Sequence, residues 1–170
     1  MREKGTSKVD DRGKEYEAFK SIEKLIFDMN HTVDAAVVEG PHDMKTLRLM
    51  GYKRPIIPCS KLSPSRIVDQ IAKRYMIVVV LTDFDSKGEV MGERLESLLK
   101  DRGVRVDRSS RRHFRRLLRR IDLDTIEGIY RLKMKLFHSN RSHHNSSHDL
   151  DCSAGCRFTS TYTFTSIVDR

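Results

Sequence analysis

The sequence predicts an α/β fold, with about four mainly parallel strands and helices on both faces of the sheet. Short apolar runs alternate with segments whose apolar residues recur every three or four positions, which is the pattern of strands and helices in turn. The most apolar run, residues 76–81, is continuous and rich in β-branched side chains, as expected of a central strand covered on both faces. Such alternation favours parallel pairing through right-handed crossovers.

Two helices and two strands are expected in the first half of the chain. Apolar spacing predicts a helix from about Tyr16 to Met29, and an apolar run predicts a strand over residues 33–38 that stops in a Glu-Gly-Pro turn. A helix follows over residues 42–50. A second short strand is expected near residues 56–57.

The same alternation continues in the second half. A Ser-Pro step at residues 63–64 is suited to the N-cap and first position of a helix that extends to Ala72. After the strand at residues 76–81, a helix is expected over residues 90–99 and a fourth strand over residues 104–106.

Two further helices are expected before the composition changes. Apolar residues from Phe114 to Ile121 share one helical face. The step from Asp124 to Glu127 is suited to a capping box, which would open a last helix ending near Phe137.

One domain with two flanking segments is expected. A length of 170 residues favours a single core. Residues 1–13 are charged and lack an apolar period, so a flexible arm is expected there, followed by the domain over residues 14–137. Residues 138–170 are rich in Ser, Thr, His and Asn, which predicts a disordered tail. Cys152 and Cys156 lack the second regular pair of a standard zinc module.

The charge and cysteine content indicate the kind of partner and compartment. Thirty-three Lys and Arg against 24 Asp and Glu give a net charge of +9, so the surface should attract polyanions. The longest apolar run is far shorter than the roughly 20 residues that a membrane-spanning helix needs, so no membrane association is expected. Three cysteines form a poor disulfide framework and favour a reducing, cytoplasmic location.

Carboxylates follow two of the predicted strands. Glu39 ends the strand at residues 33–38, and Asp83 and Asp85 follow the strand at residues 76–81. Ligands of open parallel sheets lie outside the carboxyl ends of the strands, near the point where strand order reverses. If these two strands are neighbours, the three carboxylates converge, and their mutual repulsion calls for protons or a cation.

Magnesium is the cation that such residues favour. Mg²⁺ takes oxygen ligands, often one or two carboxylates, and keeps several waters that it shares with phosphate. Alternate residues of an extended segment point the same way, so Asp83 and Asp85 are expected to face one ion while Phe84 turns to the core. Gly88 is expected to let the chain turn into the next helix close to a bound phosphate. The predicted cofactor is therefore one or two Mg²⁺ ions.

Two segments resemble the signature motifs of a known family. Val-Val-Glu-Gly-Pro-His-Asp at residues 37–43 and Leu-Thr-Asp-Phe-Asp-Ser-Lys-Gly-Glu at residues 81–89 look like the motifs of the topoisomerase-primase (Toprim) domain. The likeness covers about residues 33–107 and implies a Toprim, Rossmann-like fold. Small stand-alone Toprim proteins are the most similar, including an uncharacterised, mainly archaeal group and the maturation nuclease of 5S ribosomal RNA.

The resemblance also implies roles for individual residues. Glu39 matches the family's glutamate, to which general acid/base work or metal binding is assigned, and Asp83 and Asp85 match its magnesium-binding aspartates. Asp43 and Glu89 match acidic positions whose side chains are expected to lie next to the metal ligands without binding the ion directly. The sequence departs from the family at residues 41–42, where Pro-His replaces a step that commonly contains Lys, and at Phe84, where many members have proline.

Cationic residues give a candidate nucleic-acid surface. Arginines flank the apolar stripe of the helix near residues 111–121 and are expected to contact phosphates in a salt-dependent way, unless they pair with acids of their own fold. Lys87 is a further candidate for a phosphate contact. No aromatic ladder accompanies them, which argues against single-strand stacking. The arginines of this prediction are Arg111, Arg112, Arg115, Arg116, Arg119 and Arg120.

The leading functional hypothesis is a magnesium-dependent enzyme that acts on phosphodiester bonds of nucleic acid and resembles a nuclease, with structured RNA favoured over DNA. A non-catalytic, magnesium-dependent nucleic-acid-binding module is the alternative. A haloacid-dehalogenase-like phosphatase is a third hypothesis, because an Asp-x-Asp step after an apolar strand also opens that fold. It fits less well, since Lys87 stands where that family has Thr or Val, and the step follows a later strand rather than the first.

Overall fold

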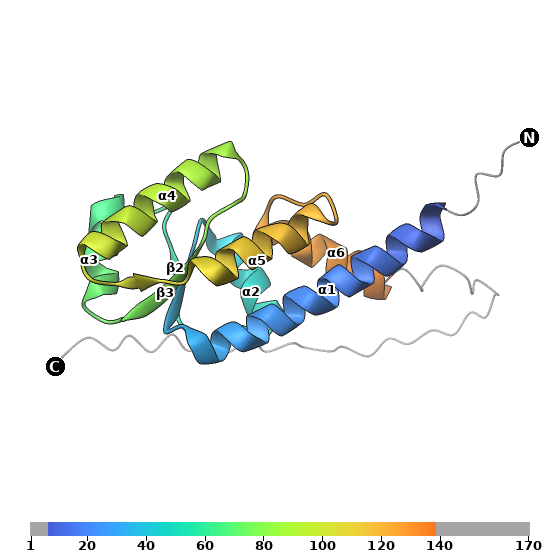
Figure 1. Ribbon diagram of the computed structural model, residues 1–170, viewed down its shortest axis with the longest axis horizontal. Helices are drawn as coiled ribbons and strands as arrows, with labels where there is room; N and C mark the ends of the chain where they lie inside the picture. The colour runs from blue at the N-terminus through green and yellow to red at the C-terminus, as the bar shows by residue number, and fades with distance from the viewer. Residues whose placement is uncertain (1–6, 139–170) are drawn as a thin grey trace, which may run out of the picture. The chain divides into compact units, whose positions relative to one another are not determined.

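The computed structural model describes residues 7–138, in which helices and strands alternate as the sequence predicts. Figure 1 shows the arrangement of these elements. The strands are β1 (Ala35–Val38), β2 (Ile56–Pro58), β3 (Ile77–Leu81) and β4 (Arg105–Val106). The helices are α1 (Ser7–Thr32), α2 (Pro41–Leu49), α3 (Pro64–Ala72), α4 (Ser86–Asp101), α5 (Arg108–Arg119) and α6 (Ile126–His138).

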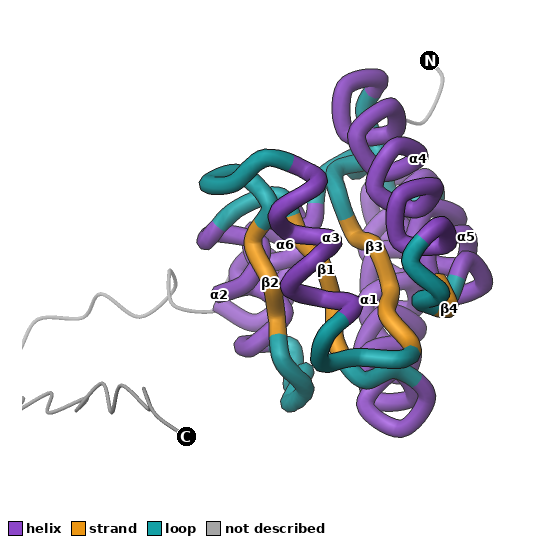
Figure 2. The backbone as a smooth tube through the Cα atoms, turned by 90° about the vertical axis from the view of Figure 1, so that its left-hand side faces the viewer, coloured by secondary structure: helices purple, strands orange, loops and turns teal. Residues whose placement is uncertain are grey.

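The four strands form one fully parallel sheet in the order β2-β1-β3-β4 (Figure 2). The pairing of β1 with β3 is the longest, with Ala35 opposite Val78 and Val38 opposite Leu81. From β1 the chain goes to β2 on one side of the sheet, and from β3 it goes to β4 on the other side. Strand order therefore reverses between β1 and β3. The condition set by the sequence, that these two strands are neighbours, is confirmed.

Helices cover both faces of the sheet, because alternate strand residues supply two separate cores. On one face Ala36, Val38, Val79 and Leu81 pack with buried residues of α1, α2, α5 and α6. On the other face Ala35, Val37, Val78 and Val80 pack with buried residues of α3 and α4. The expected fold class is confirmed both in its four parallel strands and in its two helical layers.

Helix α1 is longer than predicted. It begins at Ser7, whereas the sequence predicts an arm over residues 1–13 and a helix from about Tyr16. The early turns carry no apolar stripe, so periodicity does not reveal them. Polar contacts with α6 hold this part of the helix: Glu15 Oε1 accepts a hydrogen bond from Lys135 Nζ at 2.6 Å, and Arg12 Nη2 lies 3.5 Å from the carbonyl oxygen of Leu136.

Two other helix starts differ from their predictions. Helix α4 begins at Ser86 rather than near residue 90, because Asp85 is its N-cap, with Oδ1 accepting a hydrogen bond from Gly88 N at 2.7 Å. Helix α6 is capped by Thr125 rather than by Asp124. Thr125 Oγ1 accepts from Gly128 N at 3.1 Å, whereas the carbonyl of Asp124 accepts from Phe84 N at 2.7 Å and ties this loop to the end of β3.

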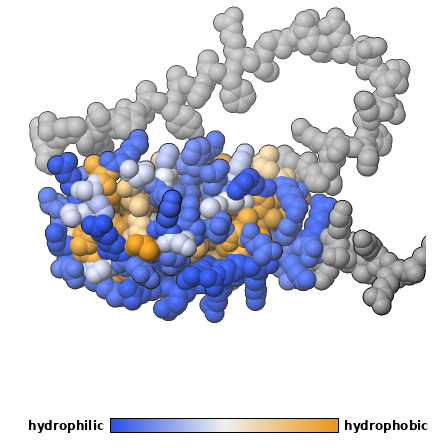
Figure 3. Space-filling model, turned by 90° about the horizontal axis from the view of Figure 1, so that it is seen from above, coloured by the Kyte–Doolittle hydropathy of each residue, from blue (hydrophilic) through white to orange (hydrophobic). Residues whose placement is uncertain are grey.

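The face of the described part that Figure 3 shows is mostly hydrophilic, with hydrophobic residues in separate groups. Within residues 7–138 no helix has the length and apolarity needed to cross a membrane. The predicted tail over residues 138–170, with Cys152 and Cys156, lies outside the described residues apart from His138 at the end of α6.

Candidate functional site

The strand register brings Glu39 and Asp83 to adjacent strand ends. Glu39 follows Val38, the last residue of β1, which is paired with Leu81, the last residue of β3. Asp83 lies two residues beyond Leu81. The backbone of Glu39 is fixed from the other side, because its carbonyl accepts a hydrogen bond from Ser60 N at 3.0 Å. Both carboxyl groups thus lie at the point where strand order reverses, the usual ligand position of such sheets.

Asp83 lies among other negatively charged side chains at this edge of the sheet. Its side chain is half-buried, and its Oδ1 accepts only a long hydrogen bond, 3.4 Å, from Ile126 N at the start of α6. Burial, together with the smaller effect of the charges of Asp43, Glu39 and Asp85, raises the pKa of Asp83 to about 6, and the hydrogen bond from Ile126 N opposes this rise. The four carboxyl groups therefore share one electrostatic environment, as repulsion between like charges requires.

Asp85 has different surroundings from Asp83. Its side chain is exposed and caps α4 through the hydrogen bond from Gly88 N, so that first-turn amide is engaged by Asp85. Phe84 between them is buried and packs into the core, as predicted. The two aspartates flank one turn, but α6 contacts the first and α4 contacts the second.

Asp43 and Glu127 add negative charge behind the strand ends. Asp43 is only 7% exposed, and its Oδ2 accepts a hydrogen bond from Gly40 N at 2.9 Å across the first turn of α2. Burial raises the pKa of Asp43, the Gly40 hydrogen bond opposes this, and the nearby charge of Glu127 adds to the rise. Sequence reasoning identified Glu127 only as a helix-capping residue, since its place beside α2 depends on how α6 packs.

The donor set fits a hard cation held partly by water. Within the described residues no three His, Cys, Asp or Glu side chains are grouped so that they could hold a metal ion together. The carboxylates at the strand ends offer oxygen ligands only, which suits Mg²⁺ bound through one or two carboxylates and several waters. The neighbouring Cys59 is buried, and burial together with the charge of Glu39 raises the pKa of its thiol to about 11, so it stays protonated and is a poor ligand.

Glu89 and Lys87 lie on the first turn of α4 but do not join the carboxylates. Glu89 pairs with two arginines of α5: its Oε1 is 3.5 Å from Arg111 Nη2, and its Oε2 is 3.5 Å from Arg115 Nη1. Lys87 is exposed. Glu89 therefore supports the neighbouring helix, and Lys87 faces solvent beside Asp85.

The arginines predicted to form the nucleic-acid surface, from α5 and its C-cap Arg120, divide into two groups. Arg112, Arg116, Arg119 and Arg120 are exposed, as a phosphate-binding surface requires. Arg111 was predicted to belong to that surface, and this prediction is wrong, because Arg111 is only 7% exposed and donates to the carbonyls of Val80 in β3 and of Thr82 just after it. Arg115 is half-exposed and paired with Glu89. Two of the six predicted arginines thus pair with acids of their own fold. Such pairing is the alternative to phosphate contact that the sequence left open.

Two glycines of α4 explain how the helix lies so close to the site. A Cβ on Gly88 would lie 2.2 Å from the carbonyl oxygen of Asp83. A Cβ on Gly92, one turn later, would lie 2.7 Å from Thr82 Oγ1 and 2.9 Å from Arg111 Nη2. The turn expected at Gly88 is present and lies against the backbone of Asp83. The need for a small residue at position 92 was not anticipated, because it depends on a side chain from α5.

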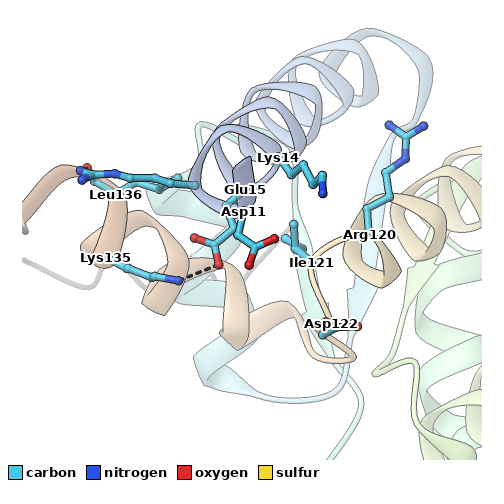
Figure 4. A pocket seen from close by; sticks show the side chains of 9 residues that line it. Asp11, Lys14, Glu15, Arg120, Ile121, Asp122, Lys135 and Leu136 are labelled. Carbon is cyan, nitrogen blue, oxygen red and sulfur yellow. Dashed lines mark hydrogen bonds and ion pairs between the residues drawn. The ribbon is translucent and has the colours of Figure 1, made fainter. Parts of the chain in front are cut away.

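One pocket lies beside Glu127, and another lies beside Arg120. A pocket of about 120 Å³ between α2 and α6 is lined in part by His42, Glu127 and Tyr130. A larger one, of about 430 Å³, is formed by the start of α1, the loop after α5 and the end of α6, and includes Arg120 (Figure 4). Figure 4 shows Lys135 directed toward Glu15 in this pocket, so charges of both signs line it.

Comparison with known proteins identifies the domain. Residues 34–115 match the Toprim domain family. A solved structure of a putative protein from Aquifex aeolicus superposes with a TM-score of 0.52 at 26% identity, over 66% of this chain and 95% of that one. Toprim domains generally bind metal and act on nucleic acid.

Curated relatives are similar over most of their length. A UPF0292 protein of Thermococcus onnurineus is 36% identical over 127 residues, which cover 75% of this chain and 94% of the relative. A UPF0292 protein of Thermococcus gammatolerans is 38% identical over 120 residues, 71% of this chain and 89% of the relative. The chain therefore belongs to the UPF0292 family of small archaeal proteins built on a stand-alone Toprim domain.

Proposed function

We propose that this protein is a magnesium-dependent enzyme that acts on phosphodiester bonds of nucleic acid, as a nuclease with structured RNA as its favoured substrate. The observation that carries the proposal is the register of β1 and β3, which puts Glu39 and Asp83 on adjacent strand ends with further carboxylates close by. Such an excess of negative charge is unfavourable without a cation, and a cation held by carboxylates can share its remaining positions with phosphate.

Each carboxylate has a role that follows from its surroundings. Asp83 and Asp85 would hold Mg²⁺, which when bound supplies positive charge to the phosphate and to the leaving oxygen. Glu39 would contribute a metal ligand or accept a proton from the attacking water. Asp43 is buried and already accepts a hydrogen bond from Gly40 N, so it adds negative charge and fixes the turn after β1.

The exposed arginines of α5 support a nucleic-acid substrate. Three exposed guanidinium groups, those of Arg112, Arg116 and Arg119, lie on α5, and the exposed group of Arg120 follows at its C-cap. Such groups contact phosphates without reading base sequence, which suits a folded RNA backbone better than an unstacked strand. RNA is favoured over DNA because the sequence motifs resemble those of a ribosomal RNA maturation nuclease.

The proposal is tested by incubating the purified full chain with a structured 5S-type precursor RNA and with duplex DNA, each with Mg²⁺ or with a chelator. Cleavage of the RNA that requires Mg²⁺ is the expected result. The matched variant is Asp83→Asn, which keeps the size of the side chain and an acceptor for Ile126 N but removes the charge. Absence of cleavage of either substrate under any condition would contradict the nuclease.

A non-catalytic binding module is the second candidate, and one observation favours it. Within the described residues, no three possible ligands are already grouped as a metal cage. A module that uses Mg²⁺ only to bridge carboxylates and phosphates needs fewer fixed ligands than a catalyst that must hold the ion in one geometry. Mg²⁺-dependent RNA binding without cleavage in the same assay would favour this candidate.

A further inference from the structure

Strand β3 extends further than β4, its neighbour on one edge. Along that edge the carbonyl of Met76 accepts from Arg105 N at 2.9 Å, and the carbonyl of Val78 accepts from Asp107 N at 2.8 Å. Strand β4 ends at Val106, and the chain then enters α5. The next two carbonyls on this edge, those of Val80 and Thr82, therefore have no neighbouring strand, although they lie in the buried interior, where an unmet carbonyl is costly.

The side chain of Arg111 takes the place of the missing strand. Its Nη1 donates to the carbonyl of Val80 at 2.9 Å and to the carbonyl of Thr82 at 3.2 Å. The guanidinium carbon also lies 4.9 Å from the centroid of the Phe84 ring. One planar cation thus extends the edge of the sheet up to the residue before Asp83 and packs on the residue after it.

Neighbouring residues of α4 are shaped around this guanidinium. Gly92 leaves the room it occupies, since a Cβ there would lie 2.9 Å from Arg111 Nη2. Glu89 and Glu96 supply negative charge, with carboxylate oxygens 3.5 Å from Nη2 and 4.0 Å from Nε. A buried arginine is stabilised by such counter-charges and by the carbonyl oxygens.

We propose that Arg111 is a positioning residue for the carboxylate site: by completing the edge of β3, it fixes the Thr82-Asp83-Phe84 backbone and thereby the direction of Asp83. Lysine does not replace it, because an ammonium group lacks the planar fork that meets two carbonyls and lies on a ring. The inference rests on the proposed function only for the cation that Asp83 would hold; the fixing of the backbone stands on the contacts alone.

The test compares Arg111→Lys with Arg108→Lys in the full chain. Arg108 lies on the same helix and donates to the same Glu96, at 2.6 Å, whereas the carbonyls of Val80 and Thr82 accept from Arg111, so the control replaces a Glu96-paired guanidinium without removing the contacts to those carbonyls. Hydrogen exchange is followed at the amides of Phe84 and Gly88, which donate to Asp124 O and Asp85 Oδ1 at 2.7 Å each. Mn²⁺ and Mg²⁺ binding is measured in parallel by titration calorimetry.

Arg111→Lys is expected to exchange both amides about tenfold faster or more, while Arg108→Lys leaves them unchanged. Cation binding is expected to weaken by about tenfold or more in Arg111→Lys alone. Equal effects of the two variants, or unchanged exchange in Arg111→Lys, would overturn the proposal. If the unaltered protein binds neither cation, the proposed function fails while the exchange comparison still decides the role of Arg111.

A second variant covers the case in which Arg111→Lys does not fold. Gly92→Ala leaves the arginine in place but adds a methyl group against Arg111 Nη2 and Thr82 Oγ1. It is expected to displace the guanidinium and to speed exchange at Phe84 and Gly88 in the same way. Full protection of both amides in a folded Gly92→Ala protein would count against the positioning role.

Discussion

Two charged regions of this molecule differ in whether their charges are balanced by groups of opposite sign. At the ends of β1 and β3, carboxylates gather with few cationic partners, and the pKa of Asp83 rises to about 6. Between α4 and α5, acids and arginines alternate, and Glu96 pairs with Arg108 at 2.6 Å while Glu89 pairs with Arg111 and Arg115. The acids and arginines of the second region pair with one another, whereas the carboxylates of the first region keep an excess of negative charge.

The difference separates residues that hold the fold from residues available for function. Arg111 meets carbonyls and carboxylates of its own fold, so its charge is used within the molecule. Asp83 accepts one long hydrogen bond and is surrounded by like charge, an arrangement retained mainly where a cation or proton is bound. Substitutions in the two regions should therefore have effects of different kinds as well as of different sizes.

The largest expected effect is that of Asp83→Asn on catalysis. Removing this carboxylate is expected to lower Mg²⁺-dependent RNA cleavage by about 100-fold or more, because the metal loses a charged ligand. The fold should be retained, since the amide oxygen still accepts from Ile126 N. Cleavage rates at saturating Mg²⁺ measure the effect. Asp69→Asn is the matched control, because Asp69 pairs with Arg102 between α3 and α4; equal losses in both variants would contradict the assignment.

The next effect concerns stability at the junction of the two regions. Gly88→Ala puts a methyl group into the backbone carbonyl of Asp83, which cannot rotate away as a side chain can. We expect a loss of about 1–3 kcal/mol or more in the free energy of unfolding, measured by urea denaturation. Gly13→Ala in α1 meets nothing within 4 Å and is expected to stabilise the helix by about 0.5–1 kcal/mol. A neutral Gly88→Ala would show that α4 can move away from Asp83.

Periodicity and strand-end residues were enough to predict the sheet and the first carboxylates. The continuous run before Asp83 predicts a strand buried on both faces, and β3 is such a strand. Asp-x-Asp after one apolar run and Glu-Gly after another place acids at carboxyl ends of strands. What the sequence left conditional was the pairing of β1 with β3, since strand order depends on contacts between distant segments.

Contacts made by side chains across elements were beyond sequence reasoning. Arg111 has the same spacing as the exposed arginines of α5, and nothing local shows that β4 ends too early to cover Val80 and Thr82. Glu127 likewise depends on the packing of α6 against α2. The helical start of α1 at Ser7 carries no apolar stripe, so periodicity misses it.

A smaller effect is expected in the pH dependence of stability without metal. The pKa of Asp83 is about 6 in the folded protein against 3.8 as its ordinary value, so the folded state binds more protons between these pH values. Stability due to this group therefore falls as pH rises from about 4 to about 6 and stays low above that. Asp83→Asn lacks this dependence.

The measurement is urea denaturation of both proteins in chelator from pH 4 to pH 7. Relative to the unaltered protein, Asp83→Asn should gain about 1 kcal/mol over this range, a value that allows for solvent screening of a half-buried carboxyl. Addition of Mg²⁺ at pH 7 should cancel much of the difference by stabilising only the unaltered protein. A constant difference across pH would mean that neither burial nor the nearby carboxylates raise the pKa of Asp83 in the folded protein.

The smallest expected effect separates exposed arginines from paired ones. Arg116→Gln is expected to weaken RNA binding by roughly two- to fivefold and to reduce the slope of log K against log salt by about 0.7–0.9, as one lost phosphate contact does. Arg102→Gln removes the same charge from the α3–α4 side, where Arg102 pairs with Asp69, and should leave the slope unchanged. Filter binding at several salt concentrations measures both. Equal slopes for the two variants would mean that RNA binding depends on the net charge of +9 and not on the exposed arginines of α5. The contrast between paired and unpaired charges would then hold only for the carboxylates at the strand ends.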